Sequence, residues 1–296
     1  MDAAELRVFE AVARHGGMGR AAEELNTVQS NVTARIRNLE DDLGTPLFRR
    51  HARGVVLTAA GQRLLPYATK LAALLKEARQ AAREDGNPAG PLVIGSLETT
   101  TAMRLSTVLS RFAETYPAVD LTLRTGTTCE LVEQVLDQQM EGAFVCGPVA
   151  HADLVTERFF VEELVLLTPP SIMSVDALTS RRDLRIVVLR RGCSYRQRLE
   201  DVLARRGAVT PRLLEFGTLE AVCACVAGGL GVTLLPRTLL DAVPSGRRLS
   251  AHTLEPAEAM VETLFVRRAD GYLSSALAAF LAAVRSPEPS LQVAAE

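Results

Sequence analysis

Apolar residues recur every three or four positions in three stretches at the start of the chain, which predicts three short helices. The first covers residues 3–15 and stops at Gly16-Gly17, the second ends at Leu25-Asn26, and the third ends at Gly44, a typical glycine at a helix C-terminus. The apolar positions are Leu6, Phe9, Val12 and Ala13, then Ala21, Ala22 and Leu25, then Val32, Ile36, Leu39 and Leu43.

The turn between the second and third helices is short, and one face of the third helix is polar. We expect this helix to begin at Thr27 or Val28, with Thr27 as its cap. Two short helices joined in this way form a helix-turn-helix, whose second helix enters the major groove of DNA. The amides of Gln29 and Asn31 can each bond an adenine edge.

Residues 49–56 are predicted to form a two-stranded wing with Gly54 at its turn. Wing arginines would contact phosphates or the minor groove; the alternative for any one arginine, though not for all of them together, is a solvated surface charge. The candidate DNA-binding residues are Thr27, Gln29, Ser30, Asn31, Thr33, Arg35, Arg37, Arg49, Arg50 and Arg53.

A longer helix is predicted after Thr58, which would cap it. Its apolar positions are spaced by four and three residues in turn, as in a coiled-coil seam. One reading is a helix packed on its own domain. We interpret it instead as a dimerisation helix, because the segment that follows, 85–91, is a linker. The seam consists of Leu64, Ala68, Leu71, Leu75, Ala78 and Ala82.

From Leu92 onwards, strand and helix patterns alternate, which indicates an α/β fold with a parallel-type sheet. About 200 residues with eight strands are best accommodated as two small α/β lobes with a ligand cleft between them. The predicted strands are 92–95, 120–124, 142–146, 164–168, 185–189, 212–215, 231–235 and 262–267, with helices at 103–115, 128–140, 195–206 and 218–227.

Composition restricts the functional class. The net charge of the 296 residues is −2, but Arg35, Arg37, Arg49, Arg50 and Arg53 cluster in the first part, which leaves room for a basic DNA-binding face.

No apolar run is long enough to span a membrane and no signal peptide is evident, so we expect a cytoplasmic protein without membrane contact. Five widely spaced cysteines and four histidines show no ligand spacing, so neither a metal nor a cofactor is expected. No catalytic motif is evident, so the chain is not expected to be an enzyme.

Specific residues of the first part resemble the winged helix-turn-helix of the LysR-type transcriptional regulators. These are Ala21-Ala22-x-x-Leu25, Gln29-Ser30-x-Val32-Thr33, Ile36-x-x-Leu39-Glu40-x-x-Leu43-Gly44-x-x-Leu47-Phe48-x-Arg50 and Leu57-Thr58-x-x-Gly61. The segment from Gly228 to Pro236 is similar to a late marker of the same family. One departure is Gly19, which stands where the family usually has a Ser or Thr capping the second helix.

The resemblance implies a domain organisation and an assembly. It implies a winged helix-turn-helix over 1–58, a linker and dimerisation helix with a hinge over 59–87, and a two-lobed effector domain like periplasmic binding proteins over 88–296. Lobe I would hold about 88–161 and 267–296, and lobe II about 162–266. Partners would be promoter DNA, a small effector and further copies of the chain. We expect a homodimer through the Leu64–Ala82 helix, and the family implies a homotetramer.

Loops rich in small hydroxyl side chains follow several predicted strands. Because ligands bind at the carboxyl ends of strands and helix N-termini favour anions, we expect these loops to hold an anionic metabolite. The alternative is that the hydroxyls only cap their helices, and Glu98 could bind a cationic group or face solvent. The candidate effector residues are Ser96, Glu98, Thr99, Thr100, Thr127, Thr128, Cys146, Cys193, Ser194 and Thr218. A second functional hypothesis is a thiol-based redox sensor that uses Cys146 and Cys193.

Overall fold

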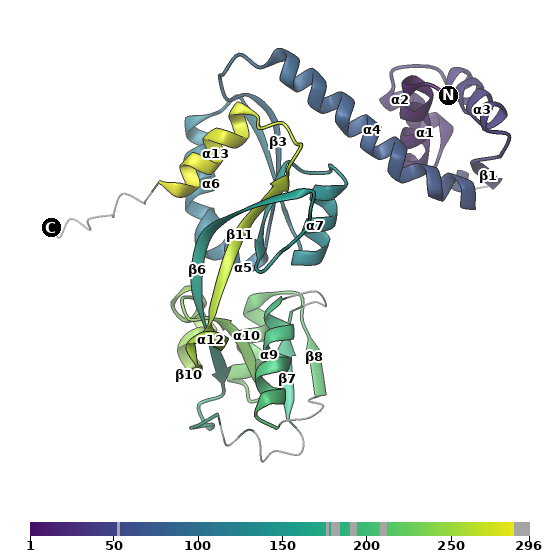
Figure 1. The fold of residues 1–296 in the computed structure, drawn as a ribbon. Helices are drawn as coiled ribbons and strands as arrows, with labels where there is room; N and C mark the ends of the chain where they lie inside the picture. Colours follow the sequence, from purple (N-terminus) through teal and green to yellow (C-terminus); the bar gives the residue numbers. More distant parts are fainter. Residues whose placement is uncertain (52–53, 176–177, 179–183, 190–193, 208–211, 287–296) are drawn as a thin grey trace. The chain divides into compact units, whose positions relative to one another are not determined.

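The structure is a computed structural model that describes residues 1–51, 54–175, 178, 184–189, 194–207 and 212–286, without the side chain of Arg50. The chain divides into two compact units, one holding Met1–Gly86 with Asp137–Gln139 and the other holding the rest (Figure 1). Within the described residues, no helix is long and apolar enough to cross a membrane.

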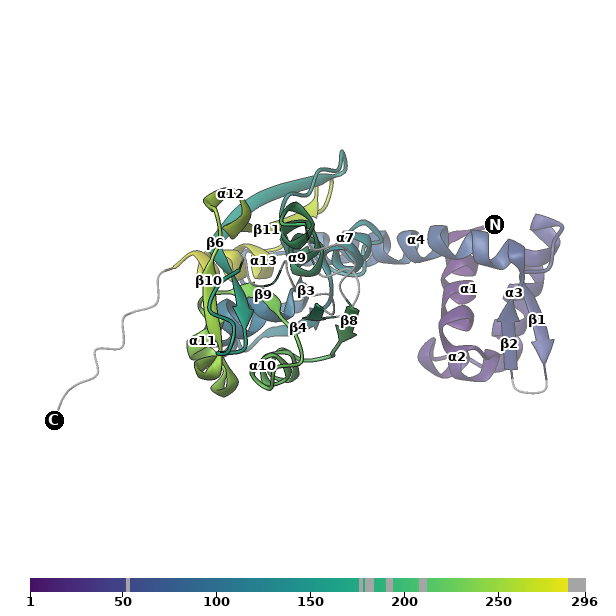
Figure 2. The same cartoon turned by 90° about the horizontal axis from the view of Figure 1, so that it is seen from below.

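The first unit is a helical domain with a β-hairpin and a long helix (Figure 2). The three predicted N-terminal helices are confirmed: a core of buried apolar side chains around Phe9, Val32 and Leu39 packs them together. The hairpin strands pair antiparallel, Phe48 opposite Leu57. The elements are α1 (Ala3–His15), α2 (Met18–Glu24), α3 (Gln29–Leu43), β1 (Phe48–His51), β2 (Gly54–Leu57) and α4 (Ala59–Arg83).

The second unit is an α/β domain in two lobes. We call the part built on β3, β4 and β5 lobe I, and the part built on β7, β8, β9 and β10 lobe II. Two long antiparallel strands, β6 and β11, pass from one lobe to the other (Figure 1). The strands are β3 (Gly90–Ser96), β4 (Val119–Thr125), β5 (Gly142–Cys146), β6 (Leu154–Thr168), β7 (Arg185–Val188), β8 (Arg212–Glu215), β9 (Thr233–Pro236), β10 (Ser250–Thr253) and β11 (Met260–Arg268).

Helices cover the sheets of both lobes. In lobe I, α6 and α13 pack through Phe112 and Phe280, whose rings meet edge to face at 5.2 Å. The helices are α5 (Glu98–Thr100), the π-helix η1 (Thr101–Leu105), α6 (Ser106–Thr115), α7 (Thr128–Leu136), α9 (Ser194–Arg205), α10 (Leu219–Ala227), α11 (Leu239–Ala242), the 3-10 helix η2 (Pro244–Arg248), α12 (Pro256–Ala259) and α13 (Ser275–Arg285).

The sheet is mixed, although the alternation of elements suggested parallel pairing throughout. The parallel pairs are β3 with β4, β3 with β5, and β7 with β8. The crossing strands β6 and β11 pair antiparallel with each other and with their other neighbours. Lobe II is therefore joined to lobe I by two continuous strands.

The glycine-rich segment before β9 has a structural role. A Cβ at Gly231 would lie 2.5 Å from the carbonyl oxygen of Arg185, so no larger residue fits without a shift of the backbone. This close approach lets Val232 form a parallel bridge with Ile186. The segment that resembles the family marker thus joins β9 to β7 in the core of lobe II.

Candidate functional site

The turn between α2 and α3 is closed by backbone contacts. Asn26 adopts a left-handed conformation (φ 50°), which asparagine tolerates better than most residues, and the N–H of Thr27 donates to the carbonyl of Ala22 at 2.9 Å. Two expectations about caps are wrong. The N-cap of α3 is Val28 rather than Thr27. Gly19 lies inside α2, whose N-cap is Gly17, so it replaces no cap.

The polar face of α3 is open to solvent at its start. Gln29, Ser30 and Asn31 are exposed, whereas Val32 and Ile36 are buried against the domain core. Residues two positions apart point to different sides of a helix, so Gln29 and Asn31 cannot address the same base pair. The side-chain amide of Asn31 also donates to the Thr27 hydroxyl at 2.9 Å.

The other candidate residues on and near this face are partly accessible. Arg37 and Arg49 are exposed, and Thr27, Thr33 and Arg35 are half-buried. Arg53 and the side chain of Arg50 lie outside the described residues. This part of the domain therefore presents an amide, a hydroxyl and several guanidinium groups in a form that a DNA duplex could contact.

Glu40, on the other side of α3, fixes the start of the hairpin. Its carboxylate accepts hydrogen bonds from the backbone N–H groups of Leu47 (2.6 Å) and Phe48 (3.1 Å). Gly54 opens β2 with φ 133°, and a Cβ there would lie 2.4 Å from the Gly16 carbonyl oxygen. The hairpin is thus held against both α3 and the turn after α1.

The first part of the predicted seam on α4 packs against the core of the first unit, and other apolar residues of the helix face solvent. Ala68 is fully buried, and Leu64 and Leu71 pack against the core of the first unit, as the reading of a helix packed on its own domain requires. Tyr67 and Leu74 were not assigned to the seam, yet their exposed fractions are 71% and 51%. They are seven residues apart and so lie on one helix face. The apolar face that α4 presents to solvent is therefore rotated relative to the predicted seam.

The N-terminus of α4 is fixed as the sequence predicts. Thr58 caps the helix by accepting a hydrogen bond from the N–H of Gly61 at 3.0 Å, and its own hydroxyl donates to the Pro46 carbonyl at 2.8 Å. The motif Leu57-Thr58-x-x-Gly61 therefore ties α4 to the segment that enters the hairpin.

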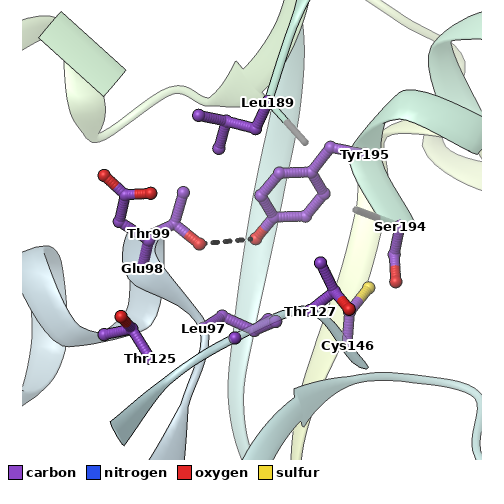
Figure 3. A pocket seen from close by; sticks show the side chains of 10 residues that line it. Leu97, Glu98, Thr99, Thr125, Thr127, Cys146, Leu189, Ser194 and Tyr195 are labelled. Atoms are coloured by element: carbon purple, nitrogen blue, oxygen red, sulfur yellow. Dashed lines mark hydrogen bonds between the residues drawn. The ribbon is translucent and has the colours of Figure 1, made fainter. Parts of the chain in front are cut away.

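A pocket of about 510 Å³, counting space open to solvent, lies between lobe I and lobe II (Figure 3). Five candidate effector residues line it, namely Glu98, Thr99, Thr127, Cys146 and Ser194. The other lining residues, Leu97, Thr125, Gly126, Leu189 and Tyr195, were not selected from the sequence. Tyr195 directly follows the selected residue Ser194 in the sequence, and this position could have identified it as a pocket residue.

Four of the remaining candidate effector residues are described and do not line the pocket, namely Ser96, Thr100, Thr128 and Thr218. Ser96 is fully buried and its hydroxyl donates to the Leu97 carbonyl. Thr218 caps α10 by accepting from the N–H of Ala221, as the alternative reading proposed for these hydroxyls. Thr100 is fully buried, and its hydroxyl has no hydrogen-bond partner among the described residues. Cys193 lies outside the described residues.

Hydrogen bonds cross the pocket from one lobe to the other. The Thr99 hydroxyl lies 3.4 Å from the Tyr195 phenol oxygen (Figure 3), and the hydroxyls of Thr128 and Ser194 are 3.1 Å apart. Thr128 also accepts from the N–H of Cys146 at 3.2 Å. The Thr99–Tyr195 and Thr128–Ser194 contacts across the pocket are thus neutral hydrogen bonds, each of which contributes only about 1 kcal/mol.

The cysteines differ in environment. Cys146 is buried at the pocket wall, and its thiol donates to the Gly147 carbonyl at 3.5 Å. Burial, with a smaller contribution from Glu220, raises the pKa of Cys223 to about 11, which makes that thiol unreactive at neutral pH. Cys129 is exposed. Cys193, the second cysteine of the redox hypothesis, lies outside the described residues.

Comparisons with known proteins point to one family. Residues 3–62 match the family described as bacterial regulatory helix-turn-helix protein, lysR family, and residues 85–287 match the LysR substrate binding domain. The chain is 43% identical over 280 residues to the HTH-type transcriptional regulator GltR of Bacillus subtilis (strain 168), with 95% of each chain covered.

Solved structures share the fold. Full-length OxyR from Pseudomonas aeruginosa superposes with a TM-score of 0.70 at 22% identity, covering 96% of this chain and 93% of that one. Full-length CbnR in complex with its target DNA superposes with a TM-score of 0.65 at 24% identity, covering 96% and 99%.

Proposed function

Because this chain belongs to the LysR family of transcriptional regulators, we propose that it changes transcription when a small carboxylate-bearing metabolite enters the pocket between lobe I and lobe II. As a member of this family it binds DNA and an effector, and it is a regulator rather than an enzyme.

The observation that carries the proposal is the ring of hydroxyl groups around the pocket. Thr99, Thr125, Thr127, Ser194 and Tyr195 bring hydroxyls from both lobes to one small volume. Hydroxyls can donate to a carboxylate, and such charge-assisted bonds are roughly twice as strong as neutral ones. A carboxylate could therefore bind both lobes at once and replace the weaker bonds that join them.

The N-terminus of α7 contributes less to such a site than the sequence suggested. The Thr127 N–H donates to the Glu130 carboxylate at 2.9 Å, and the Thr127 hydroxyl accepts from the Glu130 N–H at 3.4 Å. These two groups are already paired within the helix cap. Since the Thr127 hydroxyl still has its own proton to donate, the proposed carboxylate contact is with that O–H group rather than with these N–H groups.

On the DNA side, we propose that Gln29 and Ser30 contact base edges, and that Arg37 and Arg49 contact phosphates. The chain would act as a homodimer through the Leu64–Ala82 part of α4, with Tyr67 and Leu74 on the contact face, and as a homotetramer through further effector-domain contacts. Two copies would read two half-sites of one operator.

The effector can shift DNA binding only by its differential affinity for two arrangements of the chain, typically 1–3 kcal/mol. The test begins with operator selection from random DNA and a thermal-shift screen of metabolites on the full chain. A metabolite that binds should change the operator affinity of the wild type. Thr127→Val should weaken binding of that metabolite. Thr100→Val should not, because the Thr100 hydroxyl lies outside the pocket. If carboxylates stabilise the chain but Thr127→Val and Thr100→Val bind them as wild type does, the proposed site is wrong.

A further inference from the structure

We infer that Glu98 binds a positively charged amine, and hence that the effector is an amino acid rather than a simple carboxylic acid. This inference rests on the proposed function and specifies the ligand class of the same pocket. Glu98 is the one acidic side chain among the described residues that line the pocket.

Among the described residues, Glu98 has no charged partner. It is half-buried at the start of α5, and no described residue forms a hydrogen bond or ion pair with its carboxylate. Other nearby carboxylates are engaged: Glu162 contacts Arg104 and Tyr195, and Glu130 accepts from the N–H of Thr127. A ligand that fills the pocket removes water from Glu98, and this desolvation is unfavourable unless the ligand supplies a compensating charge.

The pocket is also polarised. Glu98 lies on the side of the pocket opposite Ser194 and Cys146, with Leu189 and the Tyr195 ring along the wall between (Figure 3). A ligand with an ammonium group at one end and a carboxylate at the other can satisfy Glu98 and the Ser194 hydroxyl together. A carboxylate without an amine would leave Glu98 desolvated and would add a second negative charge to the pocket.

The lining side chains that the structure describes include no Lys, Arg or His. They therefore provide hydroxyl groups as neutral hydrogen-bond donors and one carboxylate, that of Glu98. This set fits a single carboxylate and a single ammonium attached to a largely apolar body, since Leu97 and Leu189 provide apolar walls.

Glu98 also has a structural interpretation that the experiment must separate from this one. An acidic residue in the first turn of a helix interacts favourably with the helix dipole, and α5 leads directly into η1 and α6. If that were its whole role, Glu98→Gln would lower the melting temperature without changing which ligands bind.

The experiment first screens the L-amino acids that occur in proteins by thermal shift, and then measures their binding to the full-length chain by calorimetry. Each amino acid that binds is compared with its deaminated analogue, for instance L-leucine with 4-methylpentanoate. The variants are Glu98→Gln and, as a matched control, Glu114→Gln, which removes an exposed carboxylate near the other end of the same helical run. Losing one contact between charged groups should weaken binding about 10- to 100-fold.

We expect the amino acid to bind wild type and Glu114→Gln equally, and to bind Glu98→Gln at least about tenfold more weakly. The deaminated analogue should bind wild type weakly and gain or keep affinity in Glu98→Gln. The inference is overturned if no amino acid binds saturably at millimolar concentration, if the analogue binds as tightly as the amino acid, or if Glu98→Gln matches the control. An amine-free carboxylate that binds the pocket and changes operator affinity would overturn this inference and leave the proposed function standing.

Discussion

The Thr99 hydroxyl lies 3.4 Å from the phenol oxygen of Tyr195, which joins α5 in lobe I to α9 in lobe II. The Tyr195 hydroxyl in turn donates to the Glu162 carboxylate at 3.4 Å. Glu162 is only 4% exposed, lies on the crossing strand β6 and accepts from Arg104 at 3.3 Å. A continuous polar chain therefore connects the pocket wall to the strand that passes between the lobes.

Replacing Tyr195 with Phe should weaken this chain while keeping the ring. The variant loses the hydrogen bond to the buried Glu162 carboxylate, so the free energy of unfolding of the effector domain should fall by about 1–3 kcal/mol. Denaturant titration measures this change. Tyr116→Phe is the control, because its half-buried ring packs on Phe112 without a described hydroxyl contact. Equal stability of the two variants would show that the Tyr195 hydroxyl does not hold the lobes.

The proposed base contact of Gln29 can be separated from the phosphate contact of Arg49. Gln29→Ala should cost about 1–3 kcal/mol on the operator and relax sequence preference, whereas Arg49→Ala should weaken binding to all sequences and reduce the salt slope by about 1. Fluorescence anisotropy on operator and random duplexes at several salt concentrations measures both effects. A Gln29→Ala protein with unchanged affinity for both duplexes would refute the assignment.

The exposed face of α4 should control assembly. Changing Tyr67 and Leu74 together to Glu should dissociate the dimer, because like charges would meet across an apolar contact, and should remove tight operator binding. Gln62 and Lys76 changed to Glu form the matched control, since both are exposed on the opposite face of the helix. Analytical ultracentrifugation measures the outcome. A wild type that sediments as a monomer at micromolar concentration, or a Tyr67/Leu74 variant that stays dimeric, contradicts this prediction.

Glu258 should make the stability of the effector domain depend on pH. Its carboxylate pairs with Arg206 at 2.7 Å, and hydrogen bonds from Arg206 hold the pKa of Glu258 below its ordinary value. A lowered pKa in the folded state stabilises the fold above the unfolded pKa, about 4.3, and this contribution is lost as pH falls through the folded value. Wild type should therefore exceed Glu258→Gln in unfolding free energy at pH 7, and the gap should narrow as pH falls below the unfolded pKa and close as pH falls through the lower folded pKa. A gap that does not depend on pH would show that the ion pair contributes nothing.

Much of the fold could be predicted because burial imposes periodicity on the sequence. Each of the eight predicted strands of the second unit overlaps an observed strand, and the one predicted at 231–235 begins just before β9. The strand β10 and the helix α13 were missed. The start of β6 was also missed, because its exposed residues from Val155 to Arg158 lack an apolar run.

The site was less predictable because its geometry depends on tertiary contacts. Hydroxyls after strands mark caps and ligand contacts alike, so Thr218 and Thr127 looked the same in sequence although only Thr127 lines the pocket. The exposed apolar face of α4 could not be predicted from the sequence, also because tertiary contacts decide it. Leu64 and Leu71 have the spacing of a dimer seam, yet the first unit's own core contacts them.

Effector binding in the pocket and operator binding by the winged domain should be coupled. By linkage, an effector that changes operator affinity by some factor must have its own affinity changed by the operator by the same factor. The most direct measurement is calorimetric titration of the effector into the full-length chain, alone and saturated with operator duplex. The two dissociation constants should differ by about 5- to 150-fold, matching the shift in operator affinity. Identical constants with and without operator would contradict this coupling.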